Sequence, residues 1–395
     1  MNRRDLLAAL AASGSSLVAG RVWAAPKADA RLLVVFLRGA YDAANVVVPV
    51  GSEFYYRVRP NISIARPDLA NPLAALSLDA DWGLHPALRD TVWPLFKKGQ
   101  AAFVPFAGTD DLTRSHFETQ DTVELGQSAG GSRDYSSGFM ARLAAHLTRV
   151  RPVAFAEQIP LTFRGPLSVP NVAVNQVGKP GVDDRQSRLI QAMYQGSPLA
   201  RAVEEGFRTR DKVYHLISDH AAQADRGAVS PKGFELAARR VGQLMRDRFN
   251  LGFVDVGGWD THVNQGGAQG YLADRLGELG RGLAGFVEEI GTGWSDTVVV
   301  VVSEFGRTFR ENGSRGTDHG HGSTYWVLGG GLNGGRVAGP QVASDEAHLF
   351  QNRDTPVLTD YRTLIADLAS RLYGLDDQVM QTVFPGASRA ALGLI

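Results

Sequence analysis

The chain has 395 residues, and its 41 basic and 41 acidic side chains give a formal net charge of zero. A dedicated nucleic-acid-binding protein usually presents a basic face, so this balance argues against that class of partner. Hydrophobic residues make up 44% of the chain and charged residues 21%, which is typical of a globular protein with ample material for a core. The chain has no cysteine, so it depends on that core rather than on disulfides.

The first 24 residues have the features of an export signal. Arg3 and Arg4 are adjacent, an apolar stretch follows over residues 6–20, and small residues precede a potential cleavage point after Ala24. This arrangement resembles a twin-arginine signal. The alternatives are a membrane anchor or an ordinary first helix, but the apolar stretch is interrupted by SGSS and is shorter than the roughly 20 apolar residues that a span needs.

We therefore expect residues 1–24 to direct the protein through the twin-arginine export machinery to the periplasm or beyond. Residues 25–395 would then form a single domain, because α/β folds commonly hold about 250 residues or more around one sheet. No later run of about 18 apolar residues occurs, so no membrane span is expected in the mature chain. The twin-arginine route generally carries folded proteins, which suggests a cofactor or metal loaded before export.

The first predicted strand, Arg31–Leu37, is an apolar run followed at once by a turn that contains Asp42. If this strand is parallel to the others, Asp42 lies at the carboxyl edge of the sheet, where ligands bind in open α/β folds. Alternatively, Asp42 only supports the turn or caps a helix, as Asp often does. The sequence leaves both roles open.

A second buried strand, Ala101–Phe106, precedes Ser115. Ser115 is followed three residues later by Glu118, which is a capping box and predicts a helix from Ser115 to about Leu125. A serine at a helix N-terminus can also act as a nucleophile, because the backbone N–H groups there stabilise an anion. Both the capping role and the chemical role remain open.

The predicted strand Leu251–Val256 ends in a glycine-opened turn that carries Asp260 and His262. A carboxylate and an imidazole two residues apart can bind one metal ion, although such a pair alone is a weak signal. The next predicted helix, Tyr271–Ile290, returns the chain to the following strand. This βαβ unit predicts that the Asp260 turn lies beside the loop after that strand.

The most informative stretch is residues 297–326. Five valines follow Thr297 without polar alternation, a pattern typical of a strand buried on both faces in a helix-covered parallel sheet. Beyond the valines the chain becomes polar and rich in glycine. The polar candidates there are Glu304, Arg307, Asp318, His319 and His321. We expect this loop to form the active or binding site.

Seven carboxylates and imidazoles are candidate metal ligands: Asp42, Asp260, His262, Glu304, Asp318, His319 and His321. Mixed oxygen and nitrogen ligands suit zinc or manganese, and this set could hold one or two ions for phosphoryl or sulfuryl transfer. Alternatively, Glu304 pairs with Arg307 or Arg310, Asp318 caps a turn, and the histidines hydrogen-bond locally.

Four motifs together resemble the DUF1501 family of exported bacterial proteins of unknown function. They are LLVVFLRGAYDAANVVVP, SHFETQD, GWDTHVNQ, and SEFGRT followed by GTDHGHGS. That family is similar in fold to the alkaline phosphatase superfamily, so the resemblance implies a three-layer α/β sandwich with a central, mostly parallel sheet. It also implies that the superfamily's metal-site positions are filled, in order, by Asp42, Ser115, Asp260 with His262, Glu304, and His319 or His321.

Two departures from the superfamily pattern bear on activity. Glu304-Phe305 stands where the superfamily usually has Asp-His, so one nitrogen ligand is missing. Asp260 and His262 are two residues apart, whereas four is the usual spacing. Asp318 and His319 could restore the lost pair from the loop; otherwise the second metal position is gone.

We therefore expect an exported, metal-dependent hydrolase of small anionic phosphate or sulfate esters, with Ser115 as nucleophile and Arg307 neutralising the anion. The alternative is a noncatalytic protein that binds a ligand or partner on a degenerate version of the same fold. Phe305 favours that alternative, whereas the density of Asp and His at strand ends favours the enzyme.

Overall fold

The computed structural model describes residues 30–156, 158–173, 184–206, 233–388 and 390–395. The predicted export signal, residues 1–24, lies outside these ranges. A search of the described part of the chain finds no helix with both the length and the apolar character needed to cross a membrane.

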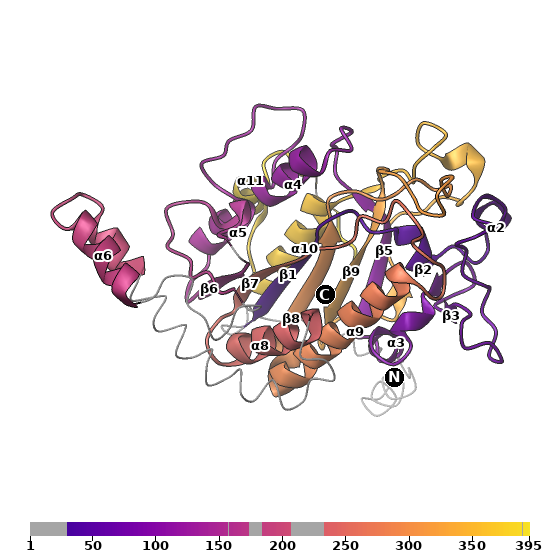
Figure 1. The fold of residues 1–395 in the computed structure, drawn as a ribbon, viewed down its shortest axis with the longest axis horizontal. Helices are drawn as coiled ribbons and strands as arrows, with labels where there is room; N and C mark the ends of the chain where they lie inside the picture. The colour runs from indigo at the N-terminus through magenta and orange to yellow at the C-terminus, as the bar shows by residue number, and fades with distance from the viewer. Residues whose placement is uncertain (1–29, 157, 174–183, 207–232, 389) are drawn as a thin grey trace, which may run out of the picture.

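A sheet of eight strands forms the centre of the described fold, in the order β10-β5-β9-β8-β1-β7-β6, with β11 paired to β5 (Figure 1). Its strands are β1 (Arg31–Leu37), β5 (Ala101–Gly108), β6 (Pro152–Phe155), β7 (Leu251–Val256), β8 (Thr297–Ser303), β9 (Ser323–Gly329), β10 (Arg336–Val337) and β11 (Thr359–Asp360). Neighbouring strands pair in parallel, except that β9 runs antiparallel to both β5 and β8. The predicted mostly parallel sheet is confirmed.

Helices cover both faces of this sheet, because alternate side chains of its inner strands point to opposite sides. Leu33, Val35 and Val299 belong to the core cluster shared with α8 (Phe234–Asp247) and α9 (Tyr271–Ile290). The intervening residues, such as Val34 and Val300, pack in a second cluster with α5 (Phe139–Ala145), α10 (Tyr361–Tyr373) and α11 (Asp377–Val383). The valine run of β8 is therefore buried on both faces, as predicted.

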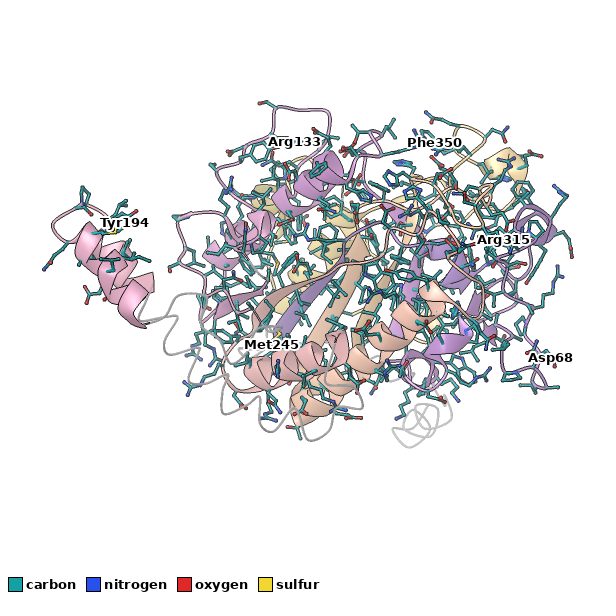
Figure 2. All side chains as sticks on the ribbon, viewed as in Figure 1. Asp68, Arg133, Tyr194, Met245, Arg315 and Phe350 are labelled. Carbon is teal, nitrogen blue, oxygen red and sulfur yellow. The ribbon has the colours of Figure 1, made fainter. Side chains whose placement is uncertain are left out.

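Smaller elements surround the three layers. A short second sheet has the order β2-β4-β3 and is built from β2 (Val47–Val48), β4 (Gly83–Leu84) and β3 (Leu76–Ser77). Other α-helices in the described part of the chain include α2 (Glu53–Val58), α3 (Val92–Lys97), α4 (His116–Leu125) and α6 (Asp184–Tyr194). Figure 2 shows side chains filling the space on both sides of the sheet, whereas α6, which carries Tyr194, projects away from the body.

The strand order refines one sequence-based prediction. The Asp260 turn was predicted to lie beside the Glu304 loop, and the two loops do meet: the Thr317 N–H donates to the carbonyl oxygen of Thr261 at 3.1 Å, and the Gln265 N–H donates to that of Arg315 at 3.0 Å. Their strands are not adjacent, because β1 lies between β7 and β8 and pairs with both of them in parallel. Val34 of β1 is in register with Phe253 on one side and with Val300 on the other. The connection through α9 therefore skips one strand position, although the loops after β7 and β8 are in contact beyond the strand ends.

His85 links the second sheet to the loop before α9. Its Nδ1 accepts a hydrogen bond from the Ala87 N–H at 3.1 Å, and its Nε2 lies 3.0 Å from the carbonyl oxygen of Gly267. Burial lowers the pKa of His85 to about 4. The neutral ring also suits these contacts, because a protonated Nδ1 could not accept from Ala87.

This lowered pKa predicts acid sensitivity. The unfolded chain, with a histidine pKa near 6.5, takes up a proton before the folded chain does, so stability falls as the pH drops from about 6.5 to about 4. We expect His85 to account for roughly 2–3 kcal/mol of this loss. Urea unfolding at pH 7, 6 and 5 would measure it, and His85→Gln should show a shallower pH dependence than the wild type. Equal slopes for the two proteins would contradict the assignment.

Candidate metal centre

Four polar side chains converge at the carboxyl edge of the sheet from three separate segments. His116 opens α4, Asp260 and His262 lie on the loop after β7, and His319 lies on the loop between β8 and β9. The Nε2 atom of His319 is 3.0 Å from Nε2 of His116 and 3.1 Å from Nε2 of His262. The carboxylate oxygens of Asp260 lie 2.9 Å, 3.5 Å and 3.7 Å from Nε2 of His262, His319 and His116, respectively.

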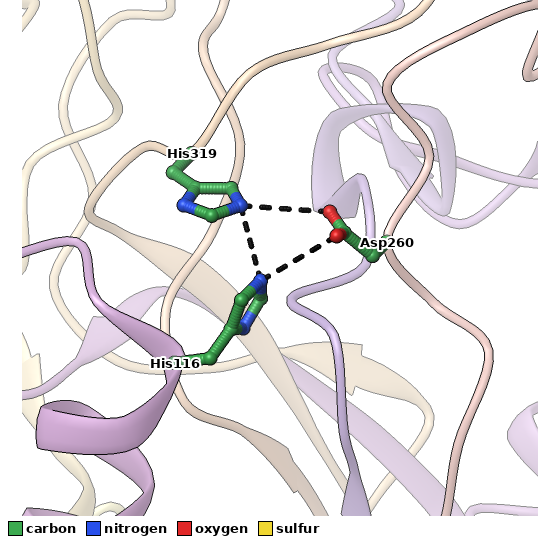
Figure 3. Close-up of side chains that lie close together, drawn as sticks. All are labelled: His116, Asp260 and His319. Atoms are coloured by element: carbon green, nitrogen blue, oxygen red, sulfur yellow. Dashed lines mark hydrogen bonds and ion pairs between the residues drawn. The ribbon is translucent and has the colours of Figure 1, made fainter.

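The spacing of these atoms fits a divalent metal ion. Zinc binds imidazole nitrogen at about 2.0–2.1 Å in tetrahedral geometry, so two of its ligand atoms lie roughly 3.3 Å apart. The distances between neighbouring atoms here fall on both sides of that value. His116, Asp260 and His319 each offer one ligand atom within 4.8 Å of the others, and Figure 3 shows the three side chains pointing at one another. We call these three residues the metal triad.

Each imidazole also has an oxygen acceptor at its other ring nitrogen. These contacts join His116 Nδ1 to Glu304 Oε1 at 2.7 Å, His319 Nδ1 to the carbonyl oxygen of Arg114 at 2.9 Å, and His262 Nδ1 to Asp318 Oδ1 at 3.2 Å. Carboxylates and carbonyls only accept hydrogen bonds, so each Nδ1 carries the hydrogen. In a neutral imidazole with its hydrogen on Nδ1, the Nε2 atom carries a lone pair that can bind a cation, and the Nε2 atom of His319 lies next to those of His116 and His262.

The local pKa shifts favour the ligating forms of the triad. Burial, together with the neighbouring charges of His116 and Arg307, lowers the pKa of His319. Burial alone would raise the pKa of Asp260, but the hydrogen bond and the charge of Arg307 outweigh it and lower that pKa. A neutral histidine and an ionised carboxylate are the forms that bind a metal ion.

Glu304 was predicted to be a metal ligand, but the structure places it behind His116. The carboxylate is fully buried, and its Oε1 accepts hydrogen bonds from the Gly39 N–H and Gln120 Nε2, both at 2.9 Å, as well as from His116. Burial would raise the pKa of Glu304, yet the hydrogen bonds from His116 and Gln120 hold it below its ordinary value. Glu304 therefore orients His116 as an ionised carboxylate partner.

Gly39 allows this arrangement because it brings the turn after β1 close to the Asp260 loop. Its φ of +118° lies in the region that side chains rarely adopt, and a Cβ atom here would lie 2.7 Å from the backbone nitrogen of Asp260. A glycine is thus required where the turn after β1 packs against the Asp260 loop.

Asp318 holds a position equivalent to that of Glu304, behind His262. Its carboxylate also accepts a hydrogen bond from Asn312 Nδ2 at 3.0 Å. The hydrogen bond from Asn312, and next that from His262, lowers the pKa of Asp318 despite some burial. Asp318 was predicted to be a ligand, and in the structure it contacts the ring nitrogen of His262 that faces away from the triad.

Asp42 and His321, the other two predicted ligands, lie away from the triad. Both oxygens of Asp42 contact the guanidinium of Arg59, at 2.6 Å and 3.1 Å, and Gln265 donates to one of them at 2.6 Å. Asp42 is therefore satisfied as a buried ion pair without a metal ion. His321 packs against Phe350 with 5.0 Å between ring centroids, and burial, with the charge of Arg114, lowers its pKa to about 4.

The two residues predicted to be catalytic occupy different environments. Ser115 is the residue before α4, but its side chain makes no capping hydrogen bond, and Glu118 pairs with Arg133 instead. The capping-box prediction is therefore wrong, because Glu118 has a charged partner outside the helix. The helix itself runs from His116 to Leu125, as predicted.

Arg307 has a buried guanidinium that joins three segments at the site. It donates to the carbonyl oxygens of Gly39 at 2.6 Å, Thr317 at 3.1 Å and Ala40, and it pairs with Asp260. One of its nitrogens also lies 3.3 Å from Nε2 of His262. Most N–H groups of Arg307 therefore donate to backbone carbonyl oxygens of the loops. Its direct contact with the metal triad is the ion pair with Asp260.

Sequence reasoning missed His116 and Gln120. Both lie within the SHFETQD segment, and His116 directly follows Ser115. The available signal was positional: a histidine at the start of a helix beyond a buried strand lies at the same carboxyl edge as the Asp260 and Glu304 loops.

Comparisons with known proteins identify a family. The family described as "Protein of unknown function (DUF1501)" matches residues 29–384. No curated protein matches the chain. Among the solved structures that match, the crystal structure of Ps i-CgsB in complex with k-i-k-neocarrahexaose has a TM-score of 0.37 and 9% sequence identity, with 89% of this chain and 74% of that chain covered. A likeness at that TM-score supports no conclusion about fold or function.

Replacing the carboxylate partner of His116 should weaken metal binding without emptying the site. Glu304→Gln keeps the shape of the side chain but removes its charge, and we expect the affinity for zinc to fall by about 10–100-fold. Isothermal titration with a competing chelator would measure this. Glu118→Gln, on the outside of α4, is the matched control and should bind zinc like the wild type. Equal affinities for all three proteins would show that Glu304 does not support the site.

The assignment of Asp42 to an ion pair makes a separate prediction about stability. Arg59→Met leaves the Asp42 carboxylate buried without its cation, and we expect a loss of about 3–5 kcal/mol in the free energy of unfolding. Arg201→Ala, which breaks the exposed pair with Glu205, should change it by less than about 0.5 kcal/mol. Urea denaturation would measure both, and a small effect of Arg59→Met would contradict this role.

Proposed function

This chain belongs to the DUF1501 family of proteins of unknown function, so its activity must be argued from its site, and we propose that it is an exported, metal-dependent hydrolase of phosphate or sulfate esters. The observation that carries the proposal is the convergence of the metal triad with His262 beside it. Each of the three histidines at the site has an oxygen acceptor at its Nδ1. That donor set suits zinc or manganese.

The metal triad offers three protein ligands, and His262 stays outside it because its Nε2 already faces a donor nitrogen of Arg307 at 3.3 Å. Three protein ligands are typical of catalytic zinc sites, which keep one position for water or substrate. A divalent metal held there supplies Lewis acidity to an ester oxygen. Hydrogen bonds at Nδ1 fix the ring orientations of His116 and His319, so that their Nε2 atoms face the metal position. Asp260 supplies a negative charge there. Asp260 has about half of its side chain exposed (46%), so a small anionic ester can reach it from solvent.

Ser115 is the nucleophile in this proposal. Its hydroxyl makes no capping hydrogen bond, and it is the chain neighbour of the triad member His116. The backbone N–H groups of the first turn of α4 favour negative charge beside it. Arg307 contributes its positive charge from behind Asp260.

We further propose an alkaline phosphatase-like fold and an exported location. The four sequence motifs and the mostly parallel, helix-covered sheet support the fold, and the adjacent arginines at positions 3 and 4 support the twin-arginine route to the periplasm. Loading the metal in the folded protein before export fits that route.

A noncatalytic ligand-binding protein is the second candidate, and Phe305 favours it. The Phe305 ring lies 5.0 Å from the ring of His116 and 5.1 Å from that of His319, so an apolar side chain occupies the place next to the triad where a further nitrogen ligand was expected. A single metal ion in such a site could hold a ligand or partner without turnover.

Metal content and turnover separate these candidates. Protein purified without chelators should carry about one equivalent of zinc or manganese by elemental analysis, and His116→Ala and His319→Ala should each lose it. The exposed His146 offers the matched control, His146→Ala, which should keep the metal.

The same proteins should be assayed against phosphomonoesters, phosphodiesters and sulfate esters with added zinc or manganese. We expect turnover by the wild type and a loss of at least about 100-fold in kcat/KM in both triad variants. Stoichiometric metal without turnover would favour the binding protein. A wild type that neither carries nor takes up metal would end both metal-based proposals.

A further inference from the structure

His319 makes two hydrogen bonds to arginines that lie outside the metal triad. Its ring Nδ1 donates to the carbonyl oxygen of Arg114 at 2.9 Å, and its own carbonyl oxygen accepts from Nη2 of Arg353 at 2.7 Å. The first contact holds the ring, and the second holds the backbone of the same residue. The remaining ring nitrogen, Nε2, faces His116 and Asp260 (Figure 3).

Both arginines pair with one carboxylate, that of Asp354. Its Oδ2 atom lies 2.9 Å from Nε and 2.7 Å from Nη2 of Arg114, and 3.4 Å from Nη1 of Arg353. The side chain of Asp354 is fully buried. A single buried carboxylate therefore joins the two residues that hold His319.

The backbone of Asp354 is anchored beside the site. Asp354 pairs with Thr308 in an antiparallel bridge, and Arg307, the residue before Thr308, forms the same kind of bridge with His319. Asp354 also exchanges two backbone hydrogen bonds with Phe350, at 2.8 Å and 3.0 Å. The carboxylate thus reaches both arginines from a fixed position.

The conformation of Arg114 indicates what the carboxylate does. Its φ of +54° lies in the left-handed region, which residues other than glycine adopt at an energetic cost. In this conformation the carbonyl oxygen of Arg114 meets Nδ1 of His319, while its guanidinium meets Asp354. The ion pair therefore supports a strained turn that places an acceptor at the histidine.

The burial of Asp354 is unfavourable in itself. Burial raises the pKa of Asp354, and the hydrogen bond from Arg114 and the charges of both arginines oppose that rise. An apolar side chain would avoid this cost, but it could not hold two guanidinium groups. The contacts of Asp354 with Arg114 and Arg353 therefore account for a carboxylate at this position.

We propose that Asp354 is a positioning residue for the metal centre. By pairing with Arg114 and Arg353, it keeps the hydrogen of His319 on Nδ1 and directs Nε2 to the metal position. The inference rests on the metal centre of the proposed function and adds a residue that acts on a ligand without touching it. Hydrogen-bond partners of a ligating histidine fix its tautomer and ring orientation, and Asp354 holds those partners in place.

Zinc affinity tests this role. Asp354 Oδ1 has no hydrogen-bond partner among the described residues, so Asp354→Asn can keep an oxygen toward both arginines and lose only the charge. We expect this variant to bind zinc about 10-fold more weakly than the wild type in a titration against a competing chelator. The matched control is Asp367→Asn, which neutralises another largely buried aspartate paired with an arginine and should bind zinc like the wild type.

A double-mutant cycle separates positioning from a general loss of stability, and thermal unfolding would show which variants remain folded. If Asp354 acts through Arg114, Asp354→Asn should weaken zinc binding less in the Arg114→Met background than in the wild type. Wild-type affinity in folded Asp354→Asn, or losses that multiply in the double variant, would overturn the proposal. If Asp354→Asn does not fold, Arg114→Met carries the same test, with the same expected loss and the same contradicting result.

The tautomer of His319 gives a readout that needs no metal. In the metal-free wild type, NMR of the histidine ring nitrogens should show the hydrogen of His319 on Nδ1, and the signal missing from His319→Gln would assign it. Asp354→Asn should move part of the population to the Nε2–H form, whereas Asp367→Asn should not.

This measurement keeps the two proposals distinguishable. If the wild type binds no metal, the proposed function fails, and the tautomer still decides the role of Asp354. A shift to the Nε2–H form in Asp354→Asn alone would support that role. A hydrogen on Nε2 in the wild type, or an unchanged tautomer in Asp354→Asn, would overturn it.

Discussion

One carboxylate oxygen, Oε1 of Glu304, holds the candidate site together. It accepts hydrogen bonds from the turn after β1 through Gly39, and from α4 through both His116 and Gln120. A buried carboxylate that lacked such donors would be costly, so β8, the β1 turn and α4 are constrained to meet at this atom. The position of His116 follows from the burial of Glu304, and the Nε2 of His116 is thereby directed toward His319 and Asp260.

The charges around the three imidazoles suit a cation. The ionised groups in contact with the rings are Glu304, Asp318, Asp260 and the guanidinium of Arg307, so the carboxylates outnumber the cation among these contacts. Arg353 adds a positive charge near Asp318. A divalent cation beside the Nε2 atoms would be stabilised by the remaining negative charge.

Local sequence patterns predicted those parts of the site that follow directly from a strand and its turn. They failed where the role of a residue depends on a partner that is distant in the sequence. Apolar runs located β1, β7 and β8, and the carboxyl-edge rule then pointed to Asp260, His262 and His319. It could not show that β1 separates β7 from β8, because strand order depends on crossovers rather than on composition. Asp42 and Glu304 are both acidic residues after strands, but one is paired with Arg59 and the other supports His116, and only the folded chain distinguishes them. His116 was overlooked because its role depends on partners that lie 144 to 203 residues away in sequence.

The same contacts favour a site for one metal ion rather than two. A second ion would require ligands near the first, yet Asp42 is bound by Arg59 and Gln265, and the ring of Phe305 packs against His116 and His319. With one metal ion, the second positive charge that stabilises an ester anion must come from the protein. The guanidinium of Arg307 is held by backbone carbonyls, so it is fixed in place before any substrate arrives. If the site is catalytic, a fixed arginine behind Asp260 therefore takes part of the electrostatic role that a second metal ion has in two-metal sites.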